Sequence, residues 1–227
     1  MSEDTVLSVP AAKALFVASD LQVFFHRDPE KDAPGLTQAE SLRAGIHAAM
    51  ADGVRSWVVG IGWVTKESAL LRKIKLALNL PGWLSPTWRL WRSSVKLDMR
   101  ETAYGKLEEE TDMTTNRVLA ADLRAAGPGV TIVYGSYVDH CARHSAFGAL
   151  DELLQAKKSG VVVLVRDAGS FSTPFFAAHP HFDRGWHRMN DESDLAIVVV
   201  DRKDISFENG RVNVRMPPRP APSALTV

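Results

Sequence analysis

Cys141, the single cysteine of the chain, has the setting that most favours catalysis. It ends the segment 135–141 (GSYVDHC), which follows an apolar run and leads into a helical pattern of apolar residues. In the first turn of a helix, free N–H groups and the positive end of the helix dipole favour a thiolate and lower its pKa. The same N–H groups can bind an oxyanion. The alternative is an inert thiol, because a lone cysteine is usually a buried small hydrophobe.

Asp20 is the second candidate, and it directly follows the apolar run 14–19. Ligands of open parallel sheets bind beyond the carboxyl ends of the strands, so a carboxylate here is well placed to accept or donate a proton. The alternative is that Asp20 only caps the turn that follows the strand.

The elements that must position these two residues follow a parallel α/β rhythm. Five short runs are rich in β-branched residues, and the last three are almost continuously apolar, as in strands covered by helices on both faces. A sixth, weaker run alternates apolar and charged residues and is placed near the sheet edge. The six predicted strands are residues 14–19, 56–61, 95–99, 130–134, 161–165 and 195–200. This pattern predicts a three-layer α/β/α sandwich of Rossmann-like topology with a six-stranded, mainly parallel sheet.

Helices are predicted where apolar residues recur at spacings of three and four, over residues 38–51, 114–126 and 140–157. Residues 81–88 (PGWLSPTW) are predicted to form a loop between the second and third predicted strands. Its tryptophans are expected either to line a pocket or to pack beneath this loop. Asn-Gly at 209–210 predicts a hairpin, and the proline-rich residues 216–227 predict an extended arm. We therefore divide the chain into a main α/β domain, residues 1–204, and a C-terminal hairpin and arm, residues 205–227.

Composition narrows the classes of function. Basic and acidic residues both number 27, so no net field attracts nucleic acid or a membrane surface. No apolar run reaches the roughly 20 residues of a membrane span, and the polar start lacks a signal pattern, so a cytoplasmic location is expected. One cysteine excludes an intramolecular disulfide. No nucleotide-binding loop or serine-nucleophile elbow occurs, and no cofactor is expected.

Three segments together resemble the isochorismatase-like cysteine hydrolases, which include nicotinamidases, N-carbamoylsarcosine amidases and isochorismatases. The segments are residues 17–25 (VASDLQVFF), 135–150 (GSYVDHCARHSAFGAL) and 161–170 (VVVLVRDAGS). They match the order of the family's Asp-x-Gln-x-x-Phe element, its Gly-x-x-x-Asp-x-Cys element and its strand ending in Arg-Asp-Ala. The resemblance spans about residues 14–200.

The resemblance implies an Asp-Lys-Cys triad, in which Asp20 takes the thiol proton, Cys141 attacks a carbonyl, and Asp20 then protonates the leaving nitrogen. Asp20 and Cys141 match the family pattern directly. For the lysine, the corresponding stretch offers both Lys96 and Arg100. Chemistry favours the lysine, whereas strand alternation favours the arginine, which cannot readily exchange a proton. Both are alternatively solvated charges at a strand edge.

The resemblance also implies an oxyanion site at the backbone N–H groups of Val138 and Cys141. In the family a non-proline cis peptide precedes the Asp-x-Cys segment, which by analogy falls between Tyr137 and Val138 and costs about 3 kcal/mol. Candidate substrate-binding residues are Gln22, Phe25, Trp63, Tyr104 and Tyr137.

No metal is expected, because residues 60–66 (GIGWVTK) lack the histidines that bind metal in nicotinamidases. His179, His181 and His187 form a second cluster, which lacks the spacing of a metal site. His140 and His144 flank Cys141 at helical spacing and could contact substrate.

The sequence thus predicts a cysteine hydrolase that cleaves a small amide or related C–N bond through a thioester. Trp63 in place of the metal loop suggests a flatter or more apolar substrate than nicotinamide. The alternatives are vinyl-ether hydrolysis of the isochorismatase type and a non-catalytic relative used as a binding or assembly partner. A small-molecule substrate and a homodimer or homotetramer are the expected partners.

Overall fold

The computed structural model describes residues 3–19, 29–60, 102–103, 123–124, 127–135, 137–188 and 196–220. Its centre is a sheet in the order β4-β3-β2-β5-β6-β8-β7. The first six of these strands are parallel to their neighbours, and β7 is antiparallel to β8. The strands are β2 (Ala14–Ser19), β3 (Arg55–Gly60), β4 (Thr102–Ala103), β5 (Val130–Gly135), β6 (Val161–Val165), β7 (Gly185–Arg188) and β8 (Ala196–Val200).

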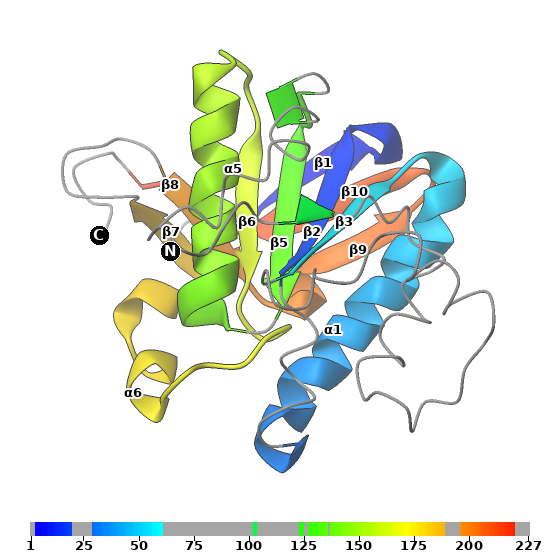
Figure 1. The fold of residues 1–227 in the computed structure, drawn as a ribbon. Helices are drawn as coiled ribbons and strands as arrows, with labels where there is room; N and C mark the ends of the chain where they lie inside the picture. The colour runs from blue at the N-terminus through cyan, green and yellow to red at the C-terminus, as the bar shows by residue number, and fades with distance from the viewer. Residues whose placement is uncertain are drawn as a thin grey trace.

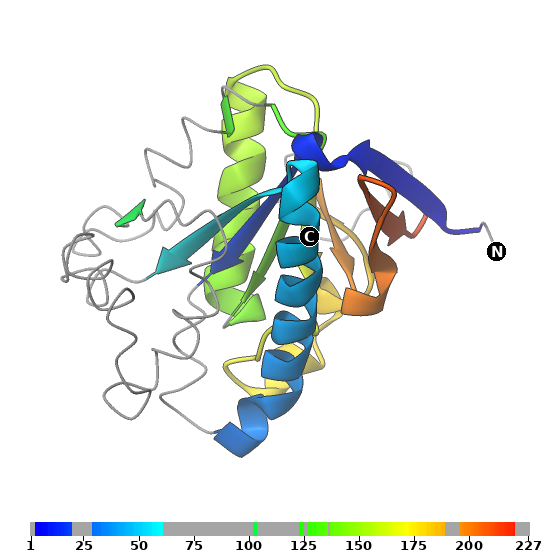
Figure 2. The ribbon, with the colours of Figure 1, turned by 90° about the vertical axis from the view of Figure 1, so that its right-hand side faces the viewer.

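Helices cover both faces of this sheet (Figures 1 and 2). On one face, Leu42 and Ile46 of α1 pack with Phe16 and Tyr134 in one hydrophobic core. On the other face, residues of α5 pack with Leu15, Leu164 and Val199 in a second core. Helical segments are α1 (Pro29–Ala49), α5 (Arg143–Gln155), α6 (Pro174–Ala177), the π-helical turn η5 (Val138–Ala142) and the 3₁₀ turns η1 (Ala11–Lys13), η3 (Met50–Asp52), η6 (Pro180–Phe182) and η7 (Arg202–Asp204). The predicted three-layer α/β/α architecture is confirmed.

A second, three-stranded antiparallel sheet in the order β1-β10-β9 lies on the same side as α1 (Figure 2). Its strands are β1 (Thr5–Pro10), β9 (Ile205–Glu208) and β10 (Arg211–Met216). β9 and β10 form the hairpin that Asn-Gly predicts, and both turn residues have positive φ, 51° at Asn209 and 69° at Gly210. Ile205, Val212 and Val214 join the α1 core, so the hairpin packs on the main sheet.

The structure departs from the predicted elements in three ways. The helix predicted at residues 38–51 begins earlier, at Pro29, with Pro34 inside it. β1 and β7 were not predicted: β1 is mostly exposed or half-buried and ends at Pro10, and β7 has only four residues and begins at Gly185. The strand predicted at residues 95–99 and most of the helix predicted at 114–126 lie outside the described residues; the described strand beside β3 is β4.

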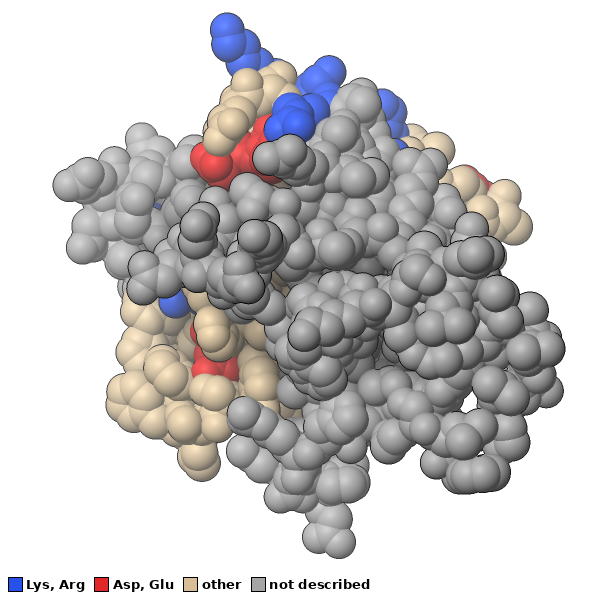
Figure 3. All heavy atoms as spheres, in the orientation of Figure 1, with Lys and Arg blue, Asp and Glu red and all other residues tan. Residues whose placement is uncertain are grey.

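The surface carries both signs of charge close together. In the view of Figure 3, lysine and arginine atoms lie beside carboxylates over the carboxyl-terminal end of α5. Exposed Lys157 and Lys158 follow that helix, and Asp151 and Glu152 lie in its last turns. Among the described helices, none is long and apolar enough to cross a membrane.

Candidate active site around Cys141

The strand register aligns the carboxyl ends of four neighbouring strands. Ser19, the last residue of β2, lies level with Val59 of β3 and with Gly135 of β5. Val59 in turn pairs with Thr102 of β4. A residue that directly follows any of these strands therefore starts from the same edge of the sheet. In the sequence, Asp20 directly follows Ser19, and the segment leading to Cys141 directly follows Gly135.

Gly135 makes this edge unusually tight. Its φ is 130°, and a Cβ atom built on it would lie 2.0 Å from the carbonyl oxygen of Ser19. A Cβ on Gly169, in the loop after β6, would lie 2.2 Å from the carbonyl oxygen of Gly135. Only glycine allows backbones to approach so closely in these conformations. The ends of β2 and β5 and the loop after β6 are thus held together by backbone contact.

Cys141 lies in η5, the turn between β5 and α5. The carbonyl oxygen of Tyr137 accepts hydrogen bonds from the N–H groups of His140, at 3.2 Å, and Ala142, at 2.9 Å. The second bond spans five residues and makes the turn π-helical, a geometry frequently found at functional sites. Cys141 is only 4% exposed. The thiol therefore lies near the sheet edge and is almost fully enclosed.

Ser145 joins this helix to the end of β2. The hydroxyls of Ser19 and Ser145 share a buried hydrogen bond of 3.2 Å. Ser145 lies four residues after Cys141, and residues at this spacing share one face of a helix. The face that carries Cys141 is thereby directed at the end of β2, where Asp20 is the next residue in the sequence.

Asp139 fastens η5 to the loop after β6. One carboxylate oxygen accepts the backbone N–H of Ser172 at 2.9 Å, and the other accepts a short hydrogen bond from the Ser172 hydroxyl. A bridge between Tyr137 and Ser170 lies beside it. Asp139 therefore holds the turn that carries Cys141.

Two expectations about the oxyanion site are wrong. The described residues contain no cis peptide, so the bond between Tyr137 and Val138 is trans. The N–H of Val138 donates to the carbonyl oxygen of Ser170 at 2.9 Å, because this segment pairs with the loop after β6. Val138 consequently has no N–H to offer an oxyanion, whereas Cys141 stays a candidate donor.

The histidines beside the cysteine interact with each other. His140 and His144 are exposed, and their Nδ1 atoms lie 3.1 Å apart in a hydrogen bond. In the second cluster, the rings of His179 and His181 are stacked, with centroids 4.4 Å apart. Within the described ranges, no three His, Cys, Asp or Glu side chains converge on a common metal position.

Of the predicted site residues, the structure describes Cys141, Val138 and Tyr137, and Tyr137 is half-buried at the start of η5. The others lie outside the described residues: Asp20, Gln22, Phe25, Trp63, Lys96, Arg100 and Tyr104. In the sequence, Lys96 and Arg100 precede β4, and Tyr104 directly follows its carboxyl end.

Sequence reasoning missed the serines that assemble the site. The spacing of four between Cys141 and Ser145 was a usable signal, because it places a hydroxyl on the face of the thiol. The position of Ser19 at the end of the first strand was another. For Ser170 and Ser172 no signal existed, because their partners come from a distant segment.

Comparison with solved structures identifies the fold. An isochorismatase family protein from Burkholderia thailandensis is 16% identical, with 89% of this chain and 96% of that chain covered and a TM-score of 0.52. The chain shares the fold of this protein. Weaker likenesses are a cysteine hydrolase from Pseudomonas syringae (13% identity, 79% and 82% covered, TM-score 0.44) and an N-carbamoylsarcosine amidase from Thermoplasma acidophilum (19% identity, 72% and 87% covered, TM-score 0.39). No family model and no curated protein sequence matches the chain.

Proposed function

We propose that the chain is an isochorismatase-like cysteine hydrolase, which cleaves a small amide or related C–N bond through a thioester on Cys141. The observation that carries the proposal is the position of Cys141 in the turn between β5 and α5, where the Ser19–Ser145 hydrogen bond ties the start of α5 to the end of β2. The shared fold, together with the three sequence segments, supports the assignment. Homodimeric or homotetrameric assembly and a cytoplasmic location belong to the same proposal.

The proposed reaction has two halves. Asp20 takes the thiol proton, the sulfur of Cys141 attacks the carbonyl carbon, and the N–H of Cys141 is the candidate donor to the oxyanion. When the C–N bond breaks, Asp20 gives its proton to the leaving nitrogen. Asp20 then takes a proton from water, the hydroxide attacks the thioester carbon, and a carboxylic acid leaves as the thiolate of Cys141 is released.

Reaction of the thiol with iodoacetamide across pH tests the nucleophile. Because Cys141 is the only cysteine, alkylation reports on it alone. We expect an alkylation rate that rises with an apparent pKa well below the free value of about 8.5. A thiol that is unreactive at pH 7 and titrates near the free value would remove the main support for the nucleophile.

Asp20→Asn tests the base. On a panel of small amides, we expect turnover to fall by about 10²-fold or more, because an amide cannot take the thiol proton. Asp52→Asn, at an exposed carboxylate of η3, is the matched control and should leave turnover unchanged. Equal turnover in both variants would refute the role of Asp20.

The third member of the triad is assigned by comparing Lys96→Met with Arg100→Met on the same amides. The variant that loses more turnover, and that raises the apparent pKa of alkylation, identifies the cation that stabilises the thiolate. If neither variant changes either quantity, neither residue fills the family's lysine role.

One observation favours a second candidate, a non-catalytic binding or assembly protein of the same fold. Cys141 is almost fully buried, and the N–H of Val138 is already bonded to Ser170. A thiol that resists alkylation, together with no turnover on the amide panel, would favour this candidate.

A further inference from the structure

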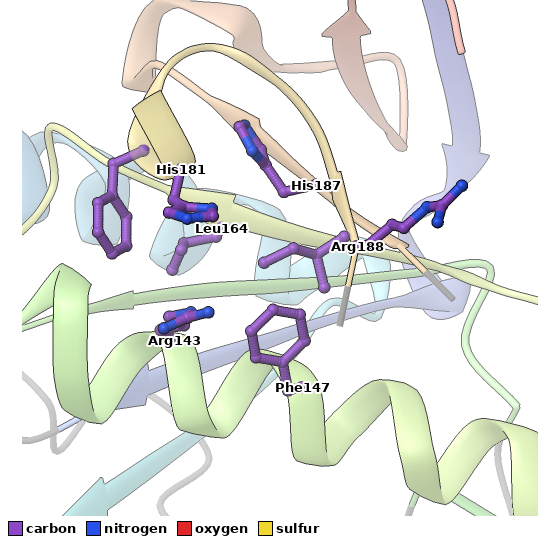
Figure 4. Close-up of a pocket in the computed structure, with 8 residues that line it drawn as sticks. Arg143, Phe147, Leu164, His181, His187 and Arg188 are labelled. Carbon is purple, nitrogen blue, oxygen red and sulfur yellow. The ribbon is translucent and has the colours of Figure 1, made fainter. Parts of the chain in front are cut away.

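A pocket that does not include the thiol lies between α5 and the segment that contains η6 and β7 (Figure 4). The space among its lining atoms is about 220 Å³ with the open solvent at its mouth included, and Cys141 is not among the lining residues. The lining residues are Arg143, Phe147, Leu164, His181, Phe182, His187, Arg188 and Ile197. The enclosed part of this space holds no more than about one water molecule, so a ligand would bind at the open mouth.

Arg143 has no carboxylate partner among the described residues. Its guanidinium carbon lies 5.2 Å from the centre of the Phe147 ring and 6.0 Å from that of Phe182. Among the described residues, no carboxylate pairs with it and no carbonyl accepts from it. Burial lowers the pKa of this guanidinium, which nevertheless stays charged at neutral pH. Within the described part of the chain, this half-buried guanidinium contacts two aromatic rings, and its five N–H donors have no hydrogen-bond acceptor.

His181 faces Arg143 across the pocket (Figure 4). Its ring is stacked on His179, and no acceptor among the described residues bonds to its ring nitrogens. Burial, and then the charges of His179, Arg143 and His187, lower the pKa of His181. The imidazole is thus neutral at pH 7, with one N–H donor and one nitrogen able to take up a proton.

The other charged groups nearby are already engaged or directed elsewhere. His187 bonds through Nε2 to the carbonyl oxygen of Asp183 at 2.7 Å, and Arg188 extends away from Arg143 (Figure 4). The Asp183 carboxylate is exposed and pairs with Arg166. No carboxylate lines the pocket among the described residues. Among the residues that the structure describes, the site therefore offers two nitrogen donors to an anion and no carboxylate that repels one.

The walls decide which anion fits. Much of the remaining lining is apolar and comes from Phe147, Leu164, Phe182 and Ile197. A dianion that bound there would exchange water molecules for apolar contacts and would gain only one cationic partner. A carboxylate carries one charge on two oxygens that match the guanidinium fork. We propose that this pocket binds a small organic carboxylate, with its charge on Arg143 and His181 and its apolar part against Phe147 and Phe182. The proposal does not depend on whether Cys141 is a nucleophile.

Titration of the full chain with benzoate, followed through the imidazole C–H signals of His181 by NMR, tests the site. His181→Gln assigns these signals. We expect saturable shifts of the His181 signals, and at least about tenfold weaker binding of the neutral analogue benzamide, because it cannot form the charged bond. Benzamide that binds as tightly as benzoate would overturn the proposal, and so would phosphate that binds more tightly.

Arg143→Gln should weaken benzoate binding at least about tenfold. Lys158→Gln, which removes one exposed positive charge beyond the other end of α5, is the matched control and should bind as the original chain does. Circular dichroism confirms that each variant is folded, and Arg143→Lys, which keeps the charge but loses the fork, provides a milder change with intermediate affinity. Cys141→Ala should leave the His181 shifts intact. Equal affinity in Arg143→Gln and Lys158→Gln, or loss of the shifts in Cys141→Ala, would overturn the assignment.

Discussion

The two faces of α5 and its preceding turn differ in how their polar groups are surrounded. Cys141 and Ser145 are buried and directed at the end of β2, where a hydroxyl of β2 and close backbone contacts enclose them. Arg143 and Phe147 line an open pocket, in which the guanidinium contacts aromatic rings and has no carboxylate partner among the described residues. Enclosed and satisfied polar groups fix the position of a reactive atom, whereas an unsatisfied charge at an opening is available to a ligand.

Helical spacing alone creates this division. Each pair is four residues apart, and the two pairs are offset by two residues, or about 200° around a helix. One helix therefore contributes to two sites that do not share lining residues. Variants on the face of Cys141 and Ser145 should consequently change stability and the position of the thiol. Variants on the face of Arg143 and Phe147 should change ligand binding and the response to pH.

Gly135→Ala should cause the largest effect on the cysteine face. Its Cβ would collide with the carbonyl oxygen of Ser19 in a backbone conformation with φ of 130°, so we expect a loss of about 3 kcal/mol or more in the free energy of unfolding. Urea denaturation measures it. Gly210→Ala is the control, because the hairpin turn has positive φ but no atom closer than 3.9 Å, and it should cost only about 1 kcal/mol. Equal losses would mean that the strand ends are not tightly held.

Asp139→Ala should have the next largest effect, because it removes both hydrogen bonds that the Asp139 carboxylate accepts from Ser172 in the loop after β6. Hydrogen bonds to a charged group contribute about 1.5–3 kcal/mol, so we expect a loss of about 2 kcal/mol. Ser172→Ala removes only the hydroxyl bond and should cost about 1 kcal/mol. If the two variants lose the same free energy of unfolding, the backbone bond to Asp139 contributes nothing to stability.

Ser145→Ala should cost about 1 kcal/mol, because it leaves the buried hydroxyl of Ser19 without this partner. A double-mutant cycle with Ser19→Ala, measured by urea denaturation, separates the hydrogen bond from packing. The double variant should lose less than the sum of the two single losses. Strict additivity would show that the two hydroxyls do not stabilise each other.

Much of this architecture was predictable from the sequence. Apolar runs located β2, β3, β5, β6 and β8 to within a residue or two, because strands buried on both faces have few polar positions. The setting of Cys141 between a strand and a helix was predictable for the same reason. Local turn chemistry was sufficient for the hairpin, since Asn-Gly adopts positive φ readily.

The rest depends on contacts between distant segments, which periodicity does not encode. The hydrogen bond from the N–H of Val138 to the carbonyl oxygen of Ser170 forms because the loop after β6 lies against η5. The pocket around Arg143 needs η6 and β7 to fold over α5, and β7 has too short an apolar pattern to predict. Family analogy also failed at the peptide before Val138, which is trans here.

The pocket face should respond to pH more than the cysteine face does. Burial lowers the pKa of His187 from its ordinary value near 6.5, and the hydrogen bond to Asp183 only partly offsets this. The unfolded chain therefore binds a proton more readily than the folded chain. Stability from this group is fully present above about pH 6.5 and is lost as pH falls through the lower pKa of the folded state.

His187→Gln should therefore flatten the decline in the free energy of unfolding between pH 8 and pH 5.5, measured by urea denaturation at each pH. His47→Gln, at an exposed position of α1, is the matched control and should keep the original decline. A double variant that also carries Ser145→Ala should lose stability equally at both pH values, because no titrating group of the pocket contacts that hydroxyl pair. If His47→Gln flattens the decline as much as His187→Gln does, the pH response belongs to histidines in general and the two faces do not differ in this respect.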